Sequence, residues 1–177
     1  MRTYEERAKD FIKEAFPYLS GMNPSAVEED MAIFNRANSR HVAVRHGIAR
    51  IALITSDYVV KYDYDEDEVE SVGGGEAEVR LYAHAMKEGF AYLFAKVTRY
   101  EYQGRKFYIM PRVRGIGRDG WNYAEDYMTE EEKDFCDRHD LCDLHCNNYG
   151  FRNGKVCIVD YACRRWYHSN SEEGSEE

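Results

Sequence analysis

The sequence predicts a single α+β domain with an antiparallel sheet. The chain has 177 residues, which is enough for one hydrophobic core and too few for two comfortable ones. Segments rich in β-branched and aromatic residues follow one another in pairs, as antiparallel strands do. Helical patterns are grouped before, between and after these pairs. A doubly wound parallel sheet would need strands and helices in regular alternation, so we do not expect one.

Four helices are expected, over residues 4–16, 25–37, 76–88 and 129–140. Pro17 ends the first pattern, because proline cannot continue a helix in its interior. Ser25 with Glu28, and Thr129 with Glu132, have the spacing of a capping box. In that motif the first side chain and the acid three residues later satisfy each other's backbone amides.

Strands are expected over residues 41–55, 57–65, 95–102, 105–113 and 151–161. Gly47 interrupts the first of these stretches. Ser56-Asp57 and Gln103-Gly104 are turn dipeptides between strands, and Asn153-Gly154 is a strong signal for a tight hairpin. The stretch from Gly115 to Tyr127 is irregular. The Ser/Glu-rich residues 169–177 are expected to form a disordered acidic tail.

The composition limits the partners that we expect. Thirty-three acidic residues against 24 basic ones give a formal net charge of -9, which disfavours nucleic acid as the main ligand. An acidic protein can still bind ATP, because Mg²⁺ shields the phosphates. The sequence has no apolar run of about 18 residues and a charged N-terminus, so neither a membrane span nor a signal peptide is expected. Five cysteines, an odd number, indicate reduced thiols and a cytoplasmic protein.

Polar residues that suit metal and phosphate chemistry gather between Asp143 and Asp160. Asp143 and Asn148 are five residues apart on a predicted loop, which allows both side chains to point into one cleft. Asp160 follows an apolar strand that would hold it nearby. Carboxylate and amide oxygens suit Mg²⁺, and the remaining carboxylate could accept a hydroxyl proton. The alternative is a polar turn before a hairpin.

Upstream motifs favour the first interpretation. Asp143, His145 and Asn148 form the pattern D-x-H-x-x-N, and Val59-Val60-Lys61 is similar to the V-A-I-K strand of kinases. Glu78 precedes apolar helix positions, and the segment 109–115 has the pattern of a gatekeeper and hinge. These elements, in this order, resemble the protein-kinase-like superfamily, including its aminoglycoside-phosphotransferase-type branch.

The resemblance implies a minimal protein-kinase-like fold and a role for each motif. Asp143 would be the catalytic base, and Asn148 and Asp160 would hold Mg²⁺. Lys61 would bind the phosphates of ATP, and Glu78 would position Lys61.

Further residues would complete the nucleotide site. Val59 would cover the adenine, Met110 would be the gatekeeper, and Val113 would bind the adenine through its backbone. Gly47 would lie in the phosphate-covering loop, which has fewer glycines here than in the family, so Arg45 or Arg50 would assist. Glu76 is the alternative to Glu78.

The resemblance covers residues 42–161 and is incomplete. The family's D-F-G motif reads Asp160-Tyr161-Ala162, without the glycine, and 17 residues follow Asp160. We therefore expect an N-terminal helical extension (residues 1–40), an N-lobe with hinge (41–114) and a truncated C-lobe (115–168). Very small kinase-like proteins of this sort resemble those of bacteriophages and bacteria, which would place a phage-encoded chain in the host cytoplasm.

Three functions follow from these expectations. The first is an ATP/Mg-binding kinase-like protein that transfers phosphate to a small molecule or a protein side chain. The second is a catalytically inactive pseudokinase that binds or inhibits a host protein. The third is a zinc-stabilised interaction module, because cysteines and histidines recur at Cys136, His139, Cys142 and His145, with Cys146 adjacent. A continuous helix would spread these residues around its axis, which disfavours a single zinc site.

Overall fold

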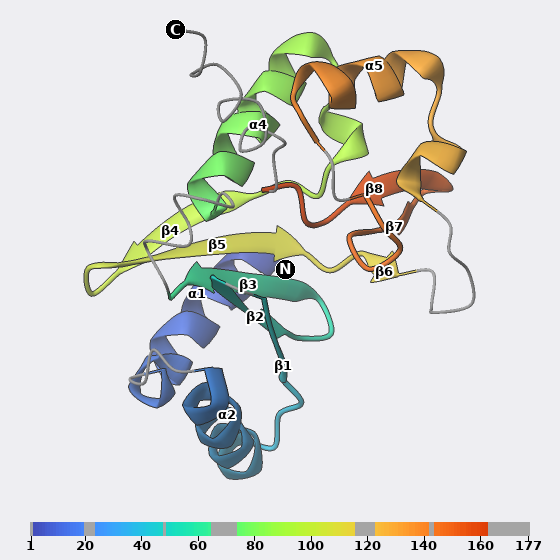
Figure 1. The fold of residues 1–177 in the computed structure, drawn as a ribbon. Coiled ribbons are helices and arrows are strands. Elements are labelled where there is room, and N and C mark those ends of the chain that lie inside the picture. The colour runs from blue at the N-terminus through green and yellow to red at the C-terminus, as the bar shows by residue number, and fades with distance from the viewer. Residues whose placement is uncertain are drawn as a thin grey trace, which may run out of the picture.

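The computed structural model describes residues 2–19, 24–47, 49–64, 74–115, 123–141 and 144–162. These residues form a mixed α+β structure (Figure 1). The helices are α1 (Tyr4–Ala15), α2 (Pro24–Asn38), α4 (Gly75–Glu88) and α5 (Glu130–Arg138), with short 3₁₀ turns at Phe16–Tyr18, Ala91–Leu93 and Ala124–Tyr127. The strands are β1 (Ala43–His46), β2 (Arg50–Ile54), β3 (Tyr58–Asp63), β4 (Thr98–Tyr102), β5 (Arg105–Pro111), β6 (Arg114–Gly115), β7 (Tyr149–Arg152) and β8 (Lys155–Ile158).

The strands form two antiparallel sheets. The larger has five strands in the order β1-β2-β3-β5-β4, and the smaller has three in the order β6-β7-β8. Helix α4 connects β3 to β4, which lie on different sides of β5. The predicted α+β class with an antiparallel sheet is therefore confirmed. Strand β6 was not predicted, because it lies at the start of the stretch that we expected to be irregular.

The five-stranded sheet separates two hydrophobic cores. Successive residues of a strand point to opposite faces, and β5 shows this clearly. Phe107 and Ile109 pack with α1 and α2, whereas Tyr108 and Met110 pack with α4 and α5. Figure 1 shows the two pairs of helices on opposite sides of the sheet. The N-terminal helices are thus part of the main structure and cover one face of the sheet.

Side-chain capping fixes the starts of α1 and α5. Thr129 Oγ1 accepts the backbone N–H of Glu132, and the Glu132 carboxylate accepts that of Thr129, which confirms the predicted capping box. The predicted start of the second helix is wrong by one residue, because α2 begins at Pro24 and includes Ser25. Proline is favoured in the first helical turn. The capping box at Thr3 was not predicted.

Two predicted hairpin turns are confirmed. Gln103 and Gly104 have φ angles of 48° and 76°, and Asn153 and Gly154 have φ angles of 53° and 77°. Positive φ at both central residues is the geometry that matches the twist of paired strands. The second turn returns the chain along β8 toward Asp160.

Several expectations fall on residues that the structure does not describe. They include Asp143, Cys142 and the acidic tail at residues 169–177. Within the described ranges, none of the helices combines the length and the apolar character that crossing a bilayer requires.

Candidate functional site

Lys61 lies at the centre of a buried charge cluster. It occupies the middle of β3, and its side chain is 9% exposed. Its ammonium donates to Glu78 Oε1 at 2.8 Å and to the carbonyl of Val159 at 2.8 Å. Asp160 Oδ1 is 3.6 Å from the same nitrogen. One lysine therefore joins the sheet, helix α4 and the segment that follows β8.

Glu78 is the anionic partner of Lys61 on helix α4. The residue is fully buried and also accepts the backbone N–H of Tyr161 at 3.4 Å. Glu76, the alternative candidate, is instead in contact with Arg99 and Lys106 at the sheet edge, at 3.2 and 3.6 Å. The structure thus brings Glu78 to Lys61 and directs Glu76 elsewhere.

Arg50 brings a second cation to the cluster. Its Nη2 is 2.5 Å from Asp160 Oδ1, and its Nη1 is 3.2 Å from Glu78 Oε1. Burial opposes ionisation of Asp160, but Lys61 and Arg50 outweigh it and lower the pKa of that carboxyl to about 2. Although burial also disfavours the charged guanidinium, the two carboxylates raise the pKa of Arg50 further. The four residues in direct contact carry two positive and two negative charges, and Asp63, the cross-strand partner of Arg50, is a third carboxyl group close enough to interact with Arg50, Glu78 and Lys61.

The sheet register explains why Arg50 reaches this site. Arg50 pairs with Asp63 and Ala52 pairs with Lys61 across β2 and β3. Alternation therefore places Arg50, Ala52 and Lys61 on the same face of the sheet. The sequence analysis expected Arg50 to assist phosphate binding and did not foresee its two carboxylate partners. The available signal was an arginine on the face opposite the buried Ile51.

The segment that contains Asp160 is fixed by contacts to Ala95, which lies between the Ala91–Leu93 turn and β4. The backbone N–H of Ala95 donates to the carbonyl of Ile158 at 2.8 Å, and the Tyr161 hydroxyl donates to the carbonyl of Ala95 at 2.6 Å. Tyr161 is 1% exposed, and burial raises the pKa of its hydroxyl well above the usual value. Tyr161 thus anchors the chain immediately after Asp160.

Asn148 and Asp160 have the chemistry that Mg²⁺ requires. The carbonyl of Asn148 accepts the backbone N–H groups of Val159 and Asp160, at 2.7 and 3.3 Å, which holds the two residues next to each other. An amide oxygen and a carboxylate are hard ligands. In addition, Glu78 Oε2 is buried and has no hydrogen-bond partner among the described residues. A buried oxygen of this kind calls for a polar partner, so the residues fit a bound cation or its water.

Two of the residues expected around the adenine, Val59 and Met110, lie on the same face of the sheet as Lys61. Val59 and Met110 are paired across β3 and β5, and Met110 is buried against the α4 side of the sheet. Val113 packs partly on the same core between β5 and β6. Val59 lies two residues before Lys61 and therefore on the same strand face.

Gly47 lies in the turn between β1 and β2. Its N–H donates to the Arg50 carbonyl at 2.9 Å, and its carbonyl accepts the Tyr64 hydroxyl at 3.0 Å. A Cβ at this position would meet no atom within 4 Å, and the backbone does not have a positive φ. The described structure therefore gives no steric reason for glycine here. Arg45 is exposed on β1, and its Nη1 donates to the carbonyl of Val44.

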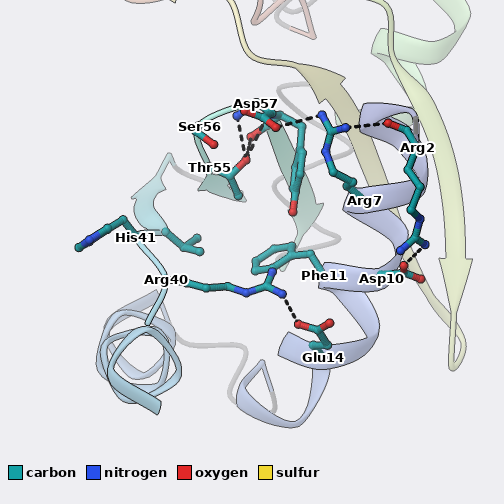
Figure 2. Close-up of a pocket in the computed structure, with 12 residues that line it drawn as sticks. Arg2, Arg7, Asp10, Phe11, Glu14, Arg40, His41, Thr55, Ser56 and Asp57 are labelled. Atoms are coloured by element: carbon teal, nitrogen blue, oxygen red, sulfur yellow. Dashed lines mark hydrogen bonds and ion pairs between the residues drawn. The ribbon is translucent and has the colours of Figure 1, made fainter. Parts of the chain in front are cut away.

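A pocket formed by described residues lies elsewhere. It has a volume of about 420 Å³ and lies between α1, the chain before β1 and the β2–β3 turn (Figure 2). Its charged walls are paired as Arg2–Asp10, Arg7–Asp57 and Arg40–Glu14. It does not include Lys61, Glu78 or Asp160, so we place the candidate site at the charge cluster.

The described part of the cysteine and histidine series does not converge. Cys136 is buried in the core, and burial raises the pKa of its thiol to about 12, which disfavours the thiolate that binds metal. The His139 ring packs against Phe135, and its Nε2 is 3.0 Å from Glu88. His145 Nδ1 accepts the backbone N–H of Asn147. Over the described ranges, no three His, Cys, Asp or Glu side chains gather as a metal site.

The sequence matches no protein-family model, and it has no significant match among curated proteins.

Proposed function

We propose that the chain is a reduced protein-kinase-like domain that binds ATP with Mg²⁺ and transfers phosphate to a hydroxyl of a small molecule or a protein side chain. The observation that carries the proposal is the buried contact between Lys61 and Glu78, with Asp160 next to it. Active protein kinases need a lysine on strand β3 paired with a helix glutamate, and a metal-binding aspartate nearby.

Burial makes this contact informative. A surface ion pair contributes little to stability, and a buried pair is often no better than apolar residues of the same size. Glu78 is 0% exposed and Lys61 is 7% exposed, so the cluster removes several charges from water. Asp160, next to this pair, has its pKa lowered to about 2 by Lys61 and Arg50, and carboxylates with shifted pKa values cluster at functional sites.

The order of elements also supports the proposal. The lysine strand β3 is followed by the glutamate helix α4, then by β4 and β5, and then by a second set of elements that includes α5 and the β7–β8 hairpin. The Asp143–Asn148 loop precedes that hairpin and Asp160 follows it. This is the order in which the family presents its lysine, glutamate, catalytic loop and metal-binding aspartate.

Each residue then has a role in phosphoryl transfer. Lys61 would hold the phosphates, and Asn148 and Asp160 would hold Mg²⁺, which neutralises phosphate charge when bound. The bond between the γ-phosphorus and the oxygen of the departing ADP breaks while a bond to the acceptor oxygen forms. The acceptor's proton passes to the Asp143 carboxylate.

A thermal-shift experiment with MgATP tests the binding. At about 100 times Kd, a ligand adds roughly 2.7 kcal/mol, which for a chain of this size raises Tm by about 5–10 °C. Lys61→Ala and Asp160→Asn should remove the shift. Lys87→Ala and Asp134→Asn, at exposed helix positions, are the matched controls and should retain it. Asp160 has a 40% exposed side chain, so its variant is the less disruptive of the two. No shift in the parent protein would contradict the proposal.

A catalytically inactive pseudokinase is the second candidate. It is favoured by the ion pair between Arg50 and Asp160, because the carboxylate expected to bind metal already contacts a guanidinium. Measuring the release of ADP distinguishes the phosphotransferase from the pseudokinase. Turnover that Asp143→Asn removes, with the MgATP shift retained, supports phosphoryl transfer. Binding without ADP release for hydroxyl-bearing small molecules and proteins supports the pseudokinase.

A further inference from the structure

Arg50 occupies the position on Asp160 where a metal ion would bind. Its Nη2 lies 2.5 Å from Asp160 Oδ1, the same oxygen that Lys61 approaches at 3.6 Å. The Arg50 side chain is only 15% exposed, and its other terminal nitrogen faces Glu78. Without any metal, the two carboxylates already have a cation each.

We propose that Arg50 makes metal binding at Asp160 conditional on a phosphate-bearing ligand, so that the site takes up a divalent ion together with nucleotide and not alone. This inference rests on the proposed function of the same site. It concerns which chemical species the site accepts, and it assigns to Arg50 a specificity role that Lys61 does not have.

A divalent ion alone faces an unfavourable exchange. It would add two positive charges beside Lys61 and would displace Arg50 from Asp160. The guanidinium stays protonated at every relevant pH, so it cannot become neutral when it loses its partner. A buried charge without a partner is strongly unfavourable. The free ion is therefore excluded even though the carboxylate suits it.

A nucleotide triphosphate removes this obstacle. Its phosphates carry negative charge for both the arriving metal and the displaced guanidinium, and arginine binds phosphate oxygens well through its fork of donors. Arg50 lies at the start of β2, directly after the turn that contains Gly47, so its backbone is next to the expected phosphate loop. Arg50 would then exchange the Asp160 carboxylate for phosphate as its partner.

The two terminal nitrogens of the Arg50 guanidinium matter as well as its charge. Nη1 faces Glu78 and Nη2 faces Asp160, so one planar group bridges two carboxylates. A lysine at this position has a single nitrogen and would hold the two carboxylates less firmly. Arg50→Lys should therefore weaken the exclusion of free metal, and Arg50→Gln, which leaves Lys61 as the remaining cation of the four-residue cluster, should abolish it.

The test uses Mn²⁺ as a spectroscopic probe in the full chain. Free Mn²⁺ is titrated into the parent, Arg50→Gln, Arg50→Lys and the control Arg80→Gln, an exposed position on α4, with bound metal followed by electron paramagnetic resonance. We expect Arg50→Gln to bind free Mn²⁺ at least about tenfold more tightly than the parent, which corresponds to 1.4 kcal/mol. Arg50→Lys should be intermediate, and Arg80→Gln should match the parent. Adding Asp160→Asn to Arg50→Gln should abolish the gain.

The outcomes separate this inference from the proposed function. Equal Mn²⁺ affinities for the parent and Arg50→Gln, with MnATP still raising Tm, would overturn the role of Arg50 and leave nucleotide binding intact. Failure of MnATP to raise Tm in both proteins would overturn both proposals. If Arg50→Gln does not fold, Arg50→Lys provides the same comparison, and an affinity equal to that of the parent then refutes the inference.

Discussion

We expect the buried Lys61–Glu78 pair to stabilise the fold no more than apolar side chains of similar size would, and to be retained for function. Removing one partner of a buried ion pair typically costs about 3–5 kcal/mol, because the other charge is left without compensation. We expect losses in this range for Lys61→Met and Glu78→Leu. The loss for Lys61→Met should be at the lower end, because Arg50 Nη1 remains 3.2 Å from Glu78.

The double variant Lys61→Met/Glu78→Leu distinguishes this view from simple packing. It leaves Arg50 paired with Asp160 and replaces the buried pair with apolar side chains, a change that is often neutral or stabilising. Its free energy of unfolding should therefore be closer to that of the parent than either single variant is. The MgATP shift should be lost in all three.

Urea denaturation followed by circular dichroism measures these free energies, with equal m values as the check on two-state unfolding. Lys96 and Glu5 provide a control pair with a similar separation of 2.7 Å but a 51% exposed lysine. The interaction free energy between Lys96 and Glu5, from the corresponding single and double variants, should stay below about 1 kcal/mol. The reasoning is refuted if the losses from Lys61→Met and Glu78→Leu add within about 0.5 kcal/mol, as independent sites do.

Two further predictions concern pH and backbone packing. Asp160 has its pKa lowered from 3.8 to about 2, so its stabilising contribution is complete above pH 3.8 and is lost as the pH falls toward 2. The parent should lose stability over this range more steeply than Asp160→Asn in acid unfolding curves, and identical slopes would contradict the shift. A Cβ on Gly150 would lie 2.3 Å from the Arg114 carbonyl and 2.8 Å from Val113 Cγ1. Gly150→Ala should therefore cost about 1–3 kcal/mol in urea denaturation, whereas Gly47→Ala should be nearly neutral; equal effects would show that the close approach does not matter.

Local chemistry made much of the secondary structure predictable. The hairpin at Asn153-Gly154 and the capping box at Thr129 each depend on residues within a few positions of one another, and both are confirmed. The start of α2 was misassigned because two signals compete there. Ser25 can cap a helix, but Pro24 can begin one, and the structure starts at Pro24.

Contacts between distant residues were harder to predict. Motif order suggested that Lys61 and Glu78 would meet, and they do. The contact of Arg50 with Asp160 joins residues 110 positions apart and depends on the β2–β3 register together with the path of the chain after β8. Neither is visible in a local pattern. The pairing of β6 with β7 was missed for the same reason.

The anchoring of Tyr161 has a consequence for how this protein could be regulated. The kinase-like D-F-G motif to which Asp160-Tyr161-Ala162 was compared ends in a flexible glycine. Here Tyr161 is buried, its hydroxyl is bound to Ala95, and Ala162 replaces the glycine. The contacts of Tyr161 therefore hold the backbone of Asp160 in one position. A change of state that keeps the Tyr161 contacts would then be a rotamer change of Arg50, which contacts Asp160, and would leave the backbone in place.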